Sequence, residues 1–346
     1  SLLCACRDQQ SLIRQLHCMV IQSGFDLFPS VNNTLVSVYG KGGFLKESKQ
    51  VFEEGDVNVR DAVSWNSMVV VYGQHGEIHK AMELIEKMSC IDAFTLASVL
   101  TAVTSAKFWS LGFQFHSAMI KRGFHCDSHV GSGLIDFYAK CGHRILDCEY
   151  AFRDVVHPDS IVWNTMISAY SLKEEYSEEA LSCFVKMQRV GHKPDDCSFA
   201  CVLRACSHLS SPRRGTQVHS LVLKSAIVSN RIQVNNALLT MYSRCGSLSD
   251  SRIQFDTMPE RNEVSFSAMI AAYSHHGNGR AGLDLFEEMI EEGLTPSSIA
   301  FVSVLSACAH CGLVEEGKKF FEMMKCDFGI NPSAEHYICL ADMFSR

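Results

Sequence analysis

One helix-like segment occurs three times in this chain, at intervals of about 100 residues. The copies read AVSWNSMVVVY at 62–72, SIVWNTMISAY at 160–170 and EVSFSAMIAAY at 263–273. Two other segments recur between these copies, so the underlying repeat is about a third as long, roughly 31 to 36 residues, with three unit types in rotation. Repeats of this length are typical of solenoids, in which each unit packs mainly on its neighbours. The repeat therefore constrains the fold more than composition does.

The residues of 160–195 predict a helical hairpin. Four apolar side chains spaced i, i+3, i+4 and i+7 predict its first helix: Trp163, Met166, Ile167 and Tyr170. A second apolar face runs from Ala180 to Met187, and Gly191 and Pro194 mark its end. Because such a hairpin cannot bury its apolar face alone, we expect the units to stack. The sequence predicts an all-α, right-handed superhelical solenoid of helix-turn-helix repeats.

Tetratricopeptide repeats are also helical hairpins of about 34 residues. Those repeats carry Gly four residues after the Trp, where close helix packing requires it. In this chain that position holds Val69, Ile167 and Ile270. The tetratricopeptide alternative therefore fails.

The sixteen cysteines suggest disulfides or metal sites until they are placed in register. Cys206 and Cys308 occupy the same position of equivalent units, where Val103 stands in a third. A position that accepts Cys or Val is a packing site, since free Cys behaves as a small buried apolar residue. The C-x-x-C from Cys308 to Cys311 has no second pair to complete a zinc site. We expect no metal and no cofactor, and a reducing compartment.

The segments WNTMISAY at 163–170, EEAL at 178–181 and MQRVGHKPD at 187–195 together resemble a pentatricopeptide repeat. The rotation of three unit types resembles the PLS class of that family, found mostly in land-plant organelles. The resemblance covers essentially the whole chain and implies one continuous solenoid. Its units are a partial L repeat at 1–28, S at 29–61, P at 62–92, L at 93–127, S at 128–159, P at 160–195, L at 196–231, S at 232–262, P at 263–297, L at 298–333 and the start of an S repeat at 334–346.

The resemblance implies that each unit recognises one RNA base through two side chains, its fifth residue and its last residue. We call these the reader residues. The reader pairs are Asn33/Asp61, Asn66/Asp92, Ser132/Asp159, Asn164/Asp195, Asn236/Asn262 and Ser267/Ser297. An Asn amide can pair with the uracil edge, and a carboxylate can accept the two adjacent donors of guanine. The alternative for any single Asn or Asp is a helix cap or turn residue.

The family places the N-terminus of the protein at the 5′ end of the RNA. From the unit at 29–61 onward, the pairs predict U, U, any base, G, U, any base, a pyrimidine and two weakly recognised bases. The fifth residue of the L units is Ala97, Ala200 or Val302, which cannot hydrogen-bond to a base edge. We expect the L units to be spacers or docking surfaces for editing cofactor proteins.

The second residue of each unit is expected to contact the faces of the bases. These residues are Val63, Phe94, His129, Ile161 and Val264. Contact with an unstacked base is worth about 1–3 kcal/mol. It would compensate for the net charge of −7, which lacks the basic footprint of a phosphate binder. The alternative for these positions is ordinary packing between helices.

No catalytic site is expected. His75 and Glu77 have the H-x-E form of a zinc deaminase, but no Pro-Cys-x-x-Cys in the sequence completes it. His116 and His219 share one position of successive L units, and a catalytic histidine would not recur once per repeat. The chain begins inside one unit and stops inside another, so we expect it to be part of a longer protein. A deaminase domain could lie in that further part.

Two functions follow from these interpretations. The first is sequence-specific binding of single-stranded RNA as the site-recognition factor for C-to-U RNA editing in mitochondria or plastids. The alternative is a structural or assembly subunit of an organellar ribonucleoprotein such as the mitoribosome, which would bind ribosomal RNA and ribosomal proteins. The reader pairs favour the first, whereas the negative charge and the pair Ser267/Ser297 favour the second. No membrane partner is expected, because no apolar run approaches the ~20 residues needed to span a bilayer.

Overall fold

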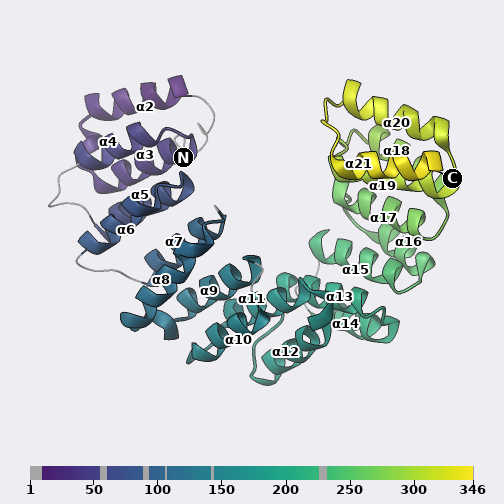
Figure 1. Ribbon diagram of the computed structural model, residues 1–346, viewed down its shortest axis with the longest axis horizontal. Coiled ribbons are helices and arrows are strands. Elements are labelled where there is room, and N and C mark those ends of the chain that lie inside the picture. Colours follow the sequence, from purple (N-terminus) through teal and green to yellow (C-terminus); the bar gives the residue numbers. More distant parts are fainter. Residues whose placement is uncertain are drawn as a thin grey trace. The chain divides into compact units, whose positions relative to one another are not determined.

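The structure, a computed structural model, describes residues 10–54, 61–88, 93–105, 107–141, 144–225 and 232–345. These ranges contain helices and connecting segments and no strand (Figure 1). The chain divides into two compact units, residues 1–169 and 170–346, and we describe each by itself. The expected all-α fold of stacked helical hairpins is confirmed. The division into L, S and P repeats stays a prediction.

In the first unit, helices follow one another in hairpins. Their bounds are α2 Gln10–Gln22, α3 Pro29–Lys41, α4 Leu45–Glu54, α5 Ala62–Gln74, α6 Ile78–Lys87, α7 Ala93–Ser105, α8 Trp109–Lys121, α9 Ser128–Lys140, α10 Ile145–Asp154 and α11 Ser160–Ser171, with 3₁₀ helices η1 Phe25–Leu27 and η2 Phe124–Cys126. The first helices of successive hairpins, α3, α5, α7 and α9, contact one another in turn. The second helices α4, α6, α8 and α10 pack on them.

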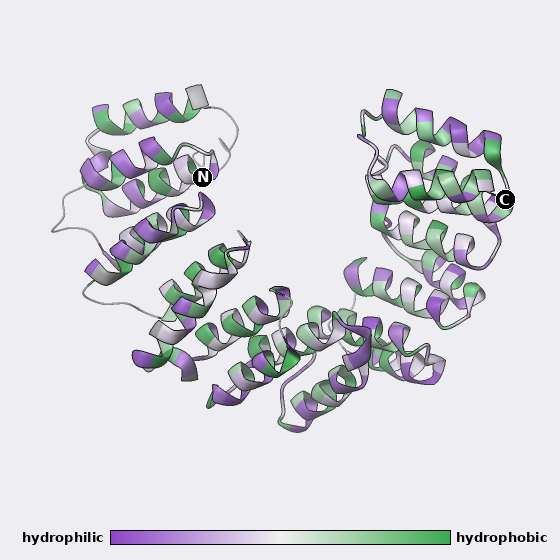
Figure 2. Ribbon diagram, in the orientation of Figure 1, coloured by the Kyte–Doolittle hydropathy of each residue, from purple (hydrophilic) through white to green (hydrophobic). Residues whose placement is uncertain are grey.

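The second unit repeats this arrangement. Its helices are α12 Ser177–Arg189, α13 Asp196–His208, α14 Pro212–Lys224, α15 Ile232–Arg244, α16 Leu248–Thr257, α17 Glu263–His275, α18 Gly279–Glu291, α19 Ser298–Cys311, α20 Val314–Cys326 and α21 Ala334–Ser345, preceded by the 3₁₀ helix η3 Glu174–Tyr176. The first helices α13, α15, α17, α19 and α21 form a continuous layer of contacts. Figure 2 shows polar and apolar residues mixed along many of the helices, and first helices such as α7 and α19 are largely apolar.

Aromatic side chains join several of the hairpins to the next. In each case a Phe on a second helix packs against the fourth residue of the following first helix. The pairs are Phe52–Trp65, Phe152–Trp163, Phe184–Phe199, Phe255–Phe266 and Phe286–Phe301, with ring centroids between 4.8 and 5.9 Å apart. Most of them meet edge to face, the arrangement that the ring quadrupoles favour. The same contact therefore fixes several of the junctions along the chain.

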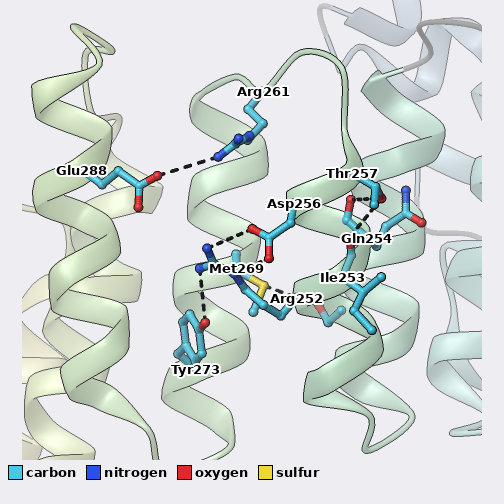
Figure 3. A network of polar contacts seen from close by, with 10 residues as sticks. Arg252, Ile253, Gln254, Asp256, Thr257, Arg261, Met269, Tyr273 and Glu288 are labelled. Atoms are coloured by element: carbon cyan, nitrogen blue, oxygen red, sulfur yellow. Dashed lines mark hydrogen bonds and ion pairs between the residues drawn. The ribbon is translucent and has the colours of Figure 1, made fainter.

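Two arginines lie at the junction between α16 and α17, where Phe255 packs against Phe266, and Figure 3 shows their polar contacts. Arg252 of α16 donates to the Tyr273 hydroxyl of α17 at 3.3 Å, and its guanidinium lies 5.4 Å from the Phe255 ring centroid. Arg261 lies 4.9 Å from the same ring and pairs with Glu288 of α18 at 3.7 Å. Both guanidinium groups thus lie near the buried Phe255 ring, and their polar contacts connect α16, α17 and α18.

The cysteines at the shared register position are packing residues, as expected. Cys206, Cys308 and Val103 are all 0% exposed. Burial raises the pKa of both thiols to about 12, so they stay protonated and unreactive. Cys148 takes the place that Ser251 has in the second unit, since each donates to a carbonyl of its paired first helix.

Glycine permits the close approach of one second helix to the next hairpin. A Cβ on Gly112 of α8 would lie 2.1 Å from the Phe137 ring of α9, and one on Gly215 of α14 would lie 2.2 Å from Sδ of Met241. A larger residue at these positions would push the helices apart. The spacing between these hairpins therefore depends on glycine, which has no side chain, at both positions.

A histidine–tyrosine contact also recurs between hairpins. The pairs are His17–Tyr39, His116–Tyr138 and His219–Tyr242, each joining an imidazole Nδ1 to a phenol hydroxyl. His116 and His219 therefore have the same structural neighbour, as their shared register indicates. Among the helices that the structure describes, none is both long and apolar enough to cross a bilayer.

Replacing Phe255 with Ala should lower the free energy of unfolding by about 3–5 kcal/mol, because a fully buried aromatic ring is lost and a cavity remains. Ile253 lies two residues earlier on α16 and is 60% exposed. Ile253→Ala should change stability by no more than about 0.5 kcal/mol. Urea unfolding followed by circular dichroism measures both. Equal losses in the two variants would contradict the role of the aromatic junction.

Stability should also depend on the protonation of His219. Burial lowers its pKa below the ordinary value of 6.5, so the unfolded chain binds the proton more readily than the folded chain. The contribution of the neutral His219 imidazole to the free energy of unfolding is therefore complete above pH 6.5, and it is lost as the pH falls through the folded pKa. His219→Gln cannot titrate but can still bond the Tyr242 hydroxyl. Its unfolding midpoint in urea should fall less than that of the wild type between about pH 7.5 and pH 5.5, and parallel curves would argue against this role.

Candidate nucleic-acid interface

The last-residue readers lie at the N-termini of first helices. Asp61, Asp195, Asn262 and Ser297 are the N-caps of α5, α13, α17 and α19, and Asp159 accepts from the Val162 amide at the start of α11. Each side chain accepts a hydrogen bond from a backbone N–H of the first turn, which would otherwise have no partner. These residues therefore cap their helices, as the alternative interpretation expected, and the cap hydrogen bond holds each side chain in a fixed position. Asp92 lies outside the described residues.

Two reader pairs are brought into direct contact between neighbouring first helices. Asn33 of α3 donates from Nδ2 to Oδ1 of Asp61 at 3.3 Å. Asn236 of α15 donates from Nδ2 to Oδ1 of Asn262 at 3.5 Å. Residues almost a full repeat apart in sequence thus form one polar group at the edge shared by two hairpins.

A serine, which sequence reasoning missed, hydrogen-bonds to each of these pairs. Ser64, the third residue of its unit, donates from Oγ to Oδ1 of Asp61 at 2.8 Å. Ser265 holds the same position, with Oγ 2.7 Å from Oδ1 of Asn236 and 3.0 Å from Oδ1 of Asn262. Asn262 and Ser265 form a capping box, and this pattern of Asn or Asp followed three residues later by Ser was visible in the sequence.

The remaining fifth residues differ in their surroundings. Asn66 and Asn164 are only 8% and 7% exposed, and the Oδ1 of Asn66 accepts from the Thr95 hydroxyl. Ser132 is half-buried and donates to the His129 carbonyl at 2.9 Å. Asn164 lies in the first compact unit and Asp195 in the second. The structure therefore shows direct contact for only some of the predicted pairs.

The pair Ser267/Ser297 is joined through a carboxylate. Ser267 of α17 donates to Oε1 of Glu263 at 2.8 Å, and the Ser297 hydroxyl donates to the same oxygen. Glu263 is the first residue of its unit, a position that the sequence analysis did not consider. It connects α17 with α19.

The second residues of the units are mostly exposed. Val63 and Ile161 are 56% exposed, Val264 is 51% exposed, and His129 is exposed as well. The side chain of Phe94 lies outside the described residues. Apolar side chains that stay in water do not fit the alternative of ordinary packing between helices. They leave apolar surface beside the reader residues.

Between α3 and α5, the reader residues Asn33 and Asp61 and the exposed Val63 line a hollow of about 530 Å³. Its lining consists of Ser30, Asn33, Thr34, Ser37, Val38, Lys41, Asp61, Val63 and Ser67. The volume is in the range of small-ligand sites, and the wall combines hydrogen-bonding groups, apolar side chains and one ammonium group. Lys41 is a further residue that the sequence analysis missed, because the negative net charge of the whole chain does not show where single basic residues lie.

The carboxylate in this hollow is ionised at neutral pH. Burial by itself would raise the pKa of Asp61, but hydrogen bonds from the Ser64 amide, the Ser64 hydroxyl and Asn33 outweigh it and lower the pKa below 3.8. Asp61 therefore presents a charged acceptor to any group that enters the hollow.

Asp61→Ala should destabilise the protein by about 1 kcal/mol at pH 7, because α5 loses its cap. Asp61→Asn keeps a capping oxygen and should cost less. The lowered pKa means that the carboxylate stabilises the fold above pH 3.8 and that this contribution is lost as the pH falls through the folded pKa. Urea unfolding at about pH 7 and about pH 3 should show the difference between wild type and Asp61→Ala shrinking in acid. A difference that stays constant would contradict this role of the charge.

Comparisons with known proteins agree with the repeated helical hairpins. A PPR repeat family model matches residues 158–208 and 261–310, and a PPR repeat model matches 33–55, 63–91 and 299–327. The pentatricopeptide repeat-containing protein At2g33680 of Arabidopsis thaliana is 37% identical over 338 residues, which cover 96% of this chain and 46% of that protein. The mitochondrial protein At3g02330 of the same plant is 36% identical over 355 residues, covering 96% and 39%. The chain thus spans less than half the length of these relatives.

Solved structures show the same fold. The crystal structure of the pentatricopeptide repeat protein PPR10 in complex with an 18-nt psaJ RNA element matches with a TM-score of 0.67 at 18% identity, covering 93% of this chain and 49% of that one. The crystal structure of the pentatricopeptide repeat protein PPR10 from maize matches with a TM-score of 0.51 at 18% identity, covering 99% of this chain and 60% of that one. With repeats matched in both units and relatives more than a third identical along almost all of its length, the chain belongs to the pentatricopeptide repeat family.

Proposed function

We propose that this chain binds single-stranded RNA and recognises one base per repeat through its reader pairs. The observation that carries the proposal is the contact between Asn33 and Asp61, which is repeated by Asn236 and Asn262 in the second unit. In both, an amide and a cap side chain lie together beside an exposed apolar residue, Val63 or Val264. Hydrogen bonding to a base edge and contact with a base face are the two components of single-strand recognition. The RNA in the PPR10 structure supports the same class of ligand.

The charge distribution is compatible with RNA despite the net charge of −7. Basic residues end three of the first helices, namely Lys41 of α3, Lys140 of α9 and Arg244 of α15. They would meet phosphates, while the cap residues would meet bases. Only a few counterions would be released, so affinity should rest largely on the bases.

The finer assignment is a site-recognition factor for C-to-U editing in an organelle. The rotation of P, L and S units supports it, since L units that lack a hydrogen-bonding fifth residue would be free to dock editing cofactor proteins. Three relatives carry the word mitochondrial in their names, which supports mitochondria more directly than plastids. The deaminase would then lie outside this chain.

A second candidate is a structural subunit of an organellar ribonucleoprotein. The observation in its favour is that the hydroxyls of Ser267 and Ser297 are both engaged by Glu263. A subunit of that kind would hold RNA or protein without discriminating between bases. Uniform affinity for all RNAs of one length would support this candidate over the first.

Ser132→Asn tests base recognition directly. The change would pair an amide with Asp159 in the unit at 128–159, the same combination of residue types as in Asn33/Asp61, which are in contact. We expect the preference at the fourth base to switch from G to U by about 1–3 kcal/mol, the scale of one good base-edge contact. Fluorescence anisotropy with nine-nucleotide RNAs of the predicted order, varied only at the fourth base, measures it.

The matched control is Ser117→Asn on the exposed side of α8, which should leave the ranking of the RNAs unchanged. An equal loss of affinity for all four RNAs would show that Ser132 is structural. An unchanged ranking with Ser132→Asn would show that this unit does not recognise a base.

A further inference from the structure

Glu263 occupies the reader site of its own unit. It is the first residue of α17, and its Oε1 accepts from Ser267 one turn further along the same helix. The same oxygen accepts from Ser297, the N-cap of α19. One carboxylate therefore contacts both residues that register assigns to base recognition.

These hydrogen bonds change what the site can offer to a base. Each serine hydroxyl has one proton, and both protons are donated to Glu263. Only lone pairs then remain, on the two serine oxygens and on the carboxylate. By contrast, the pair Asn236/Asn262 of the preceding unit retains amide N–H groups. The unit at 263–297 is thus an acceptor-only site.

Burial makes the Glu263 carboxylate, and not the Ser267 hydroxyl, the group that an entering base would meet. Ser267 is 5% exposed, whereas Glu263 is half-buried and directly precedes Val264, which is 51% exposed. Val264 holds the position expected to contact the base face. A base that packs on Val264 therefore lies beside the Glu263 carboxylate.

We propose that Glu263 is a third specificity-determining residue of the unit at 263–297 and makes it select guanine, at the eighth base of the predicted RNA. This inference rests on the proposed RNA-binding function. Guanine presents two adjacent donors, N1–H and the N2 amino group, which match the acceptors left at this site: Oε2 of Glu263, which neither serine uses, and the serine hydroxyl oxygens. Uracil presents a carbonyl on each side of its single N–H, and these would face the oxygens of the site. Cytosine and adenine each present one amino group next to an acceptor nitrogen.

Desolvation strengthens this discrimination. A carboxylate that is covered by a base without enough donors loses water and gains no partner, which is costly. Sites that contain a buried polar group therefore reject ligands that leave the group unpaired more strongly than apolar sites reject small differences in shape. The pair Ser267/Ser297, which register alone marks as weak, becomes selective through its neighbour.

Glu263→Gln is the decisive substitution. The Gln carbonyl can still accept from the serines, but its amide adds a donor and removes the charge. We expect the wild type to bind RNA with G at the eighth base about tenfold more tightly than RNA with U there, and the variant to lose this preference. The measurement is anisotropy with four nine-nucleotide RNAs that differ only at that base. Glu287→Gln removes the same charge from the exposed side of α18 and should keep the wild-type ranking.

The outcomes separate this inference from the function on which it rests. Wild-type protein that discriminates at the fourth base but binds all four eighth-base RNAs equally would overturn the role of Glu263 alone. Wild-type protein that discriminates at neither base would overturn both proposals. A Glu263→Gln protein that is less stable but keeps the preference for G would show that Glu263 only ties α17 to α19. Should Glu263→Gln fail to fold, Glu263→Ala provides the same comparison, with the preference for G again expected to be lost.

Discussion

The aromatic contact between one hairpin and the next is the interaction on which the rest of the structure depends. Phe255 meets Phe266 at 5.1 Å, and both rings are fully buried. Phe266 lies directly between Ser265 and Ser267, so the side chains that hold or form the polar groups are fixed by the same turn of helix that packs the ring. Because a close-packed ring has few alternative positions, the distance between neighbouring first helices is set to within hydrogen-bonding reach. The candidate interface is therefore a consequence of core packing.

The cap residues serve the helix and the interface at once. Asp61 satisfies a backbone N–H at the start of α5 and also accepts from the side chain of Asn33 on the preceding first helix. A side chain held in this way loses little further conformational freedom when a ligand arrives. A polar cap satisfies a backbone N–H at the start of a first helix, so placing the reader residue there adds no new unsatisfied group to the fold.

The sequence predicts the fold well and the interface only in part. Apolar spacing and repetition are local and occur many times, so helical hairpins could be inferred without structural information. The register of the reader pairs came from the family resemblance, and the structure shows contact for Asn33/Asp61 and Asn236/Asn262. The engagement of Ser297 by Glu263 could not be inferred, because these residues are a repeat apart and Glu at the start of a helix has an ordinary explanation in the helix dipole.

The acidity of the chain is less of an obstacle to RNA than its net charge suggests. Carboxylates at first-helix N-termini, such as those of Asp61 and Asp195, lie where the helix dipole is positive, and their hydrogen bonds to backbone amides offset part of their charge. The basic side chains of Lys41 and Arg244 lie at the opposite ends of their first helices. A single strand that runs along the first helices would therefore place its bases near the acceptors and its phosphates near the cations. Net charge averages over these two groups, whereas an RNA strand would meet each of them separately.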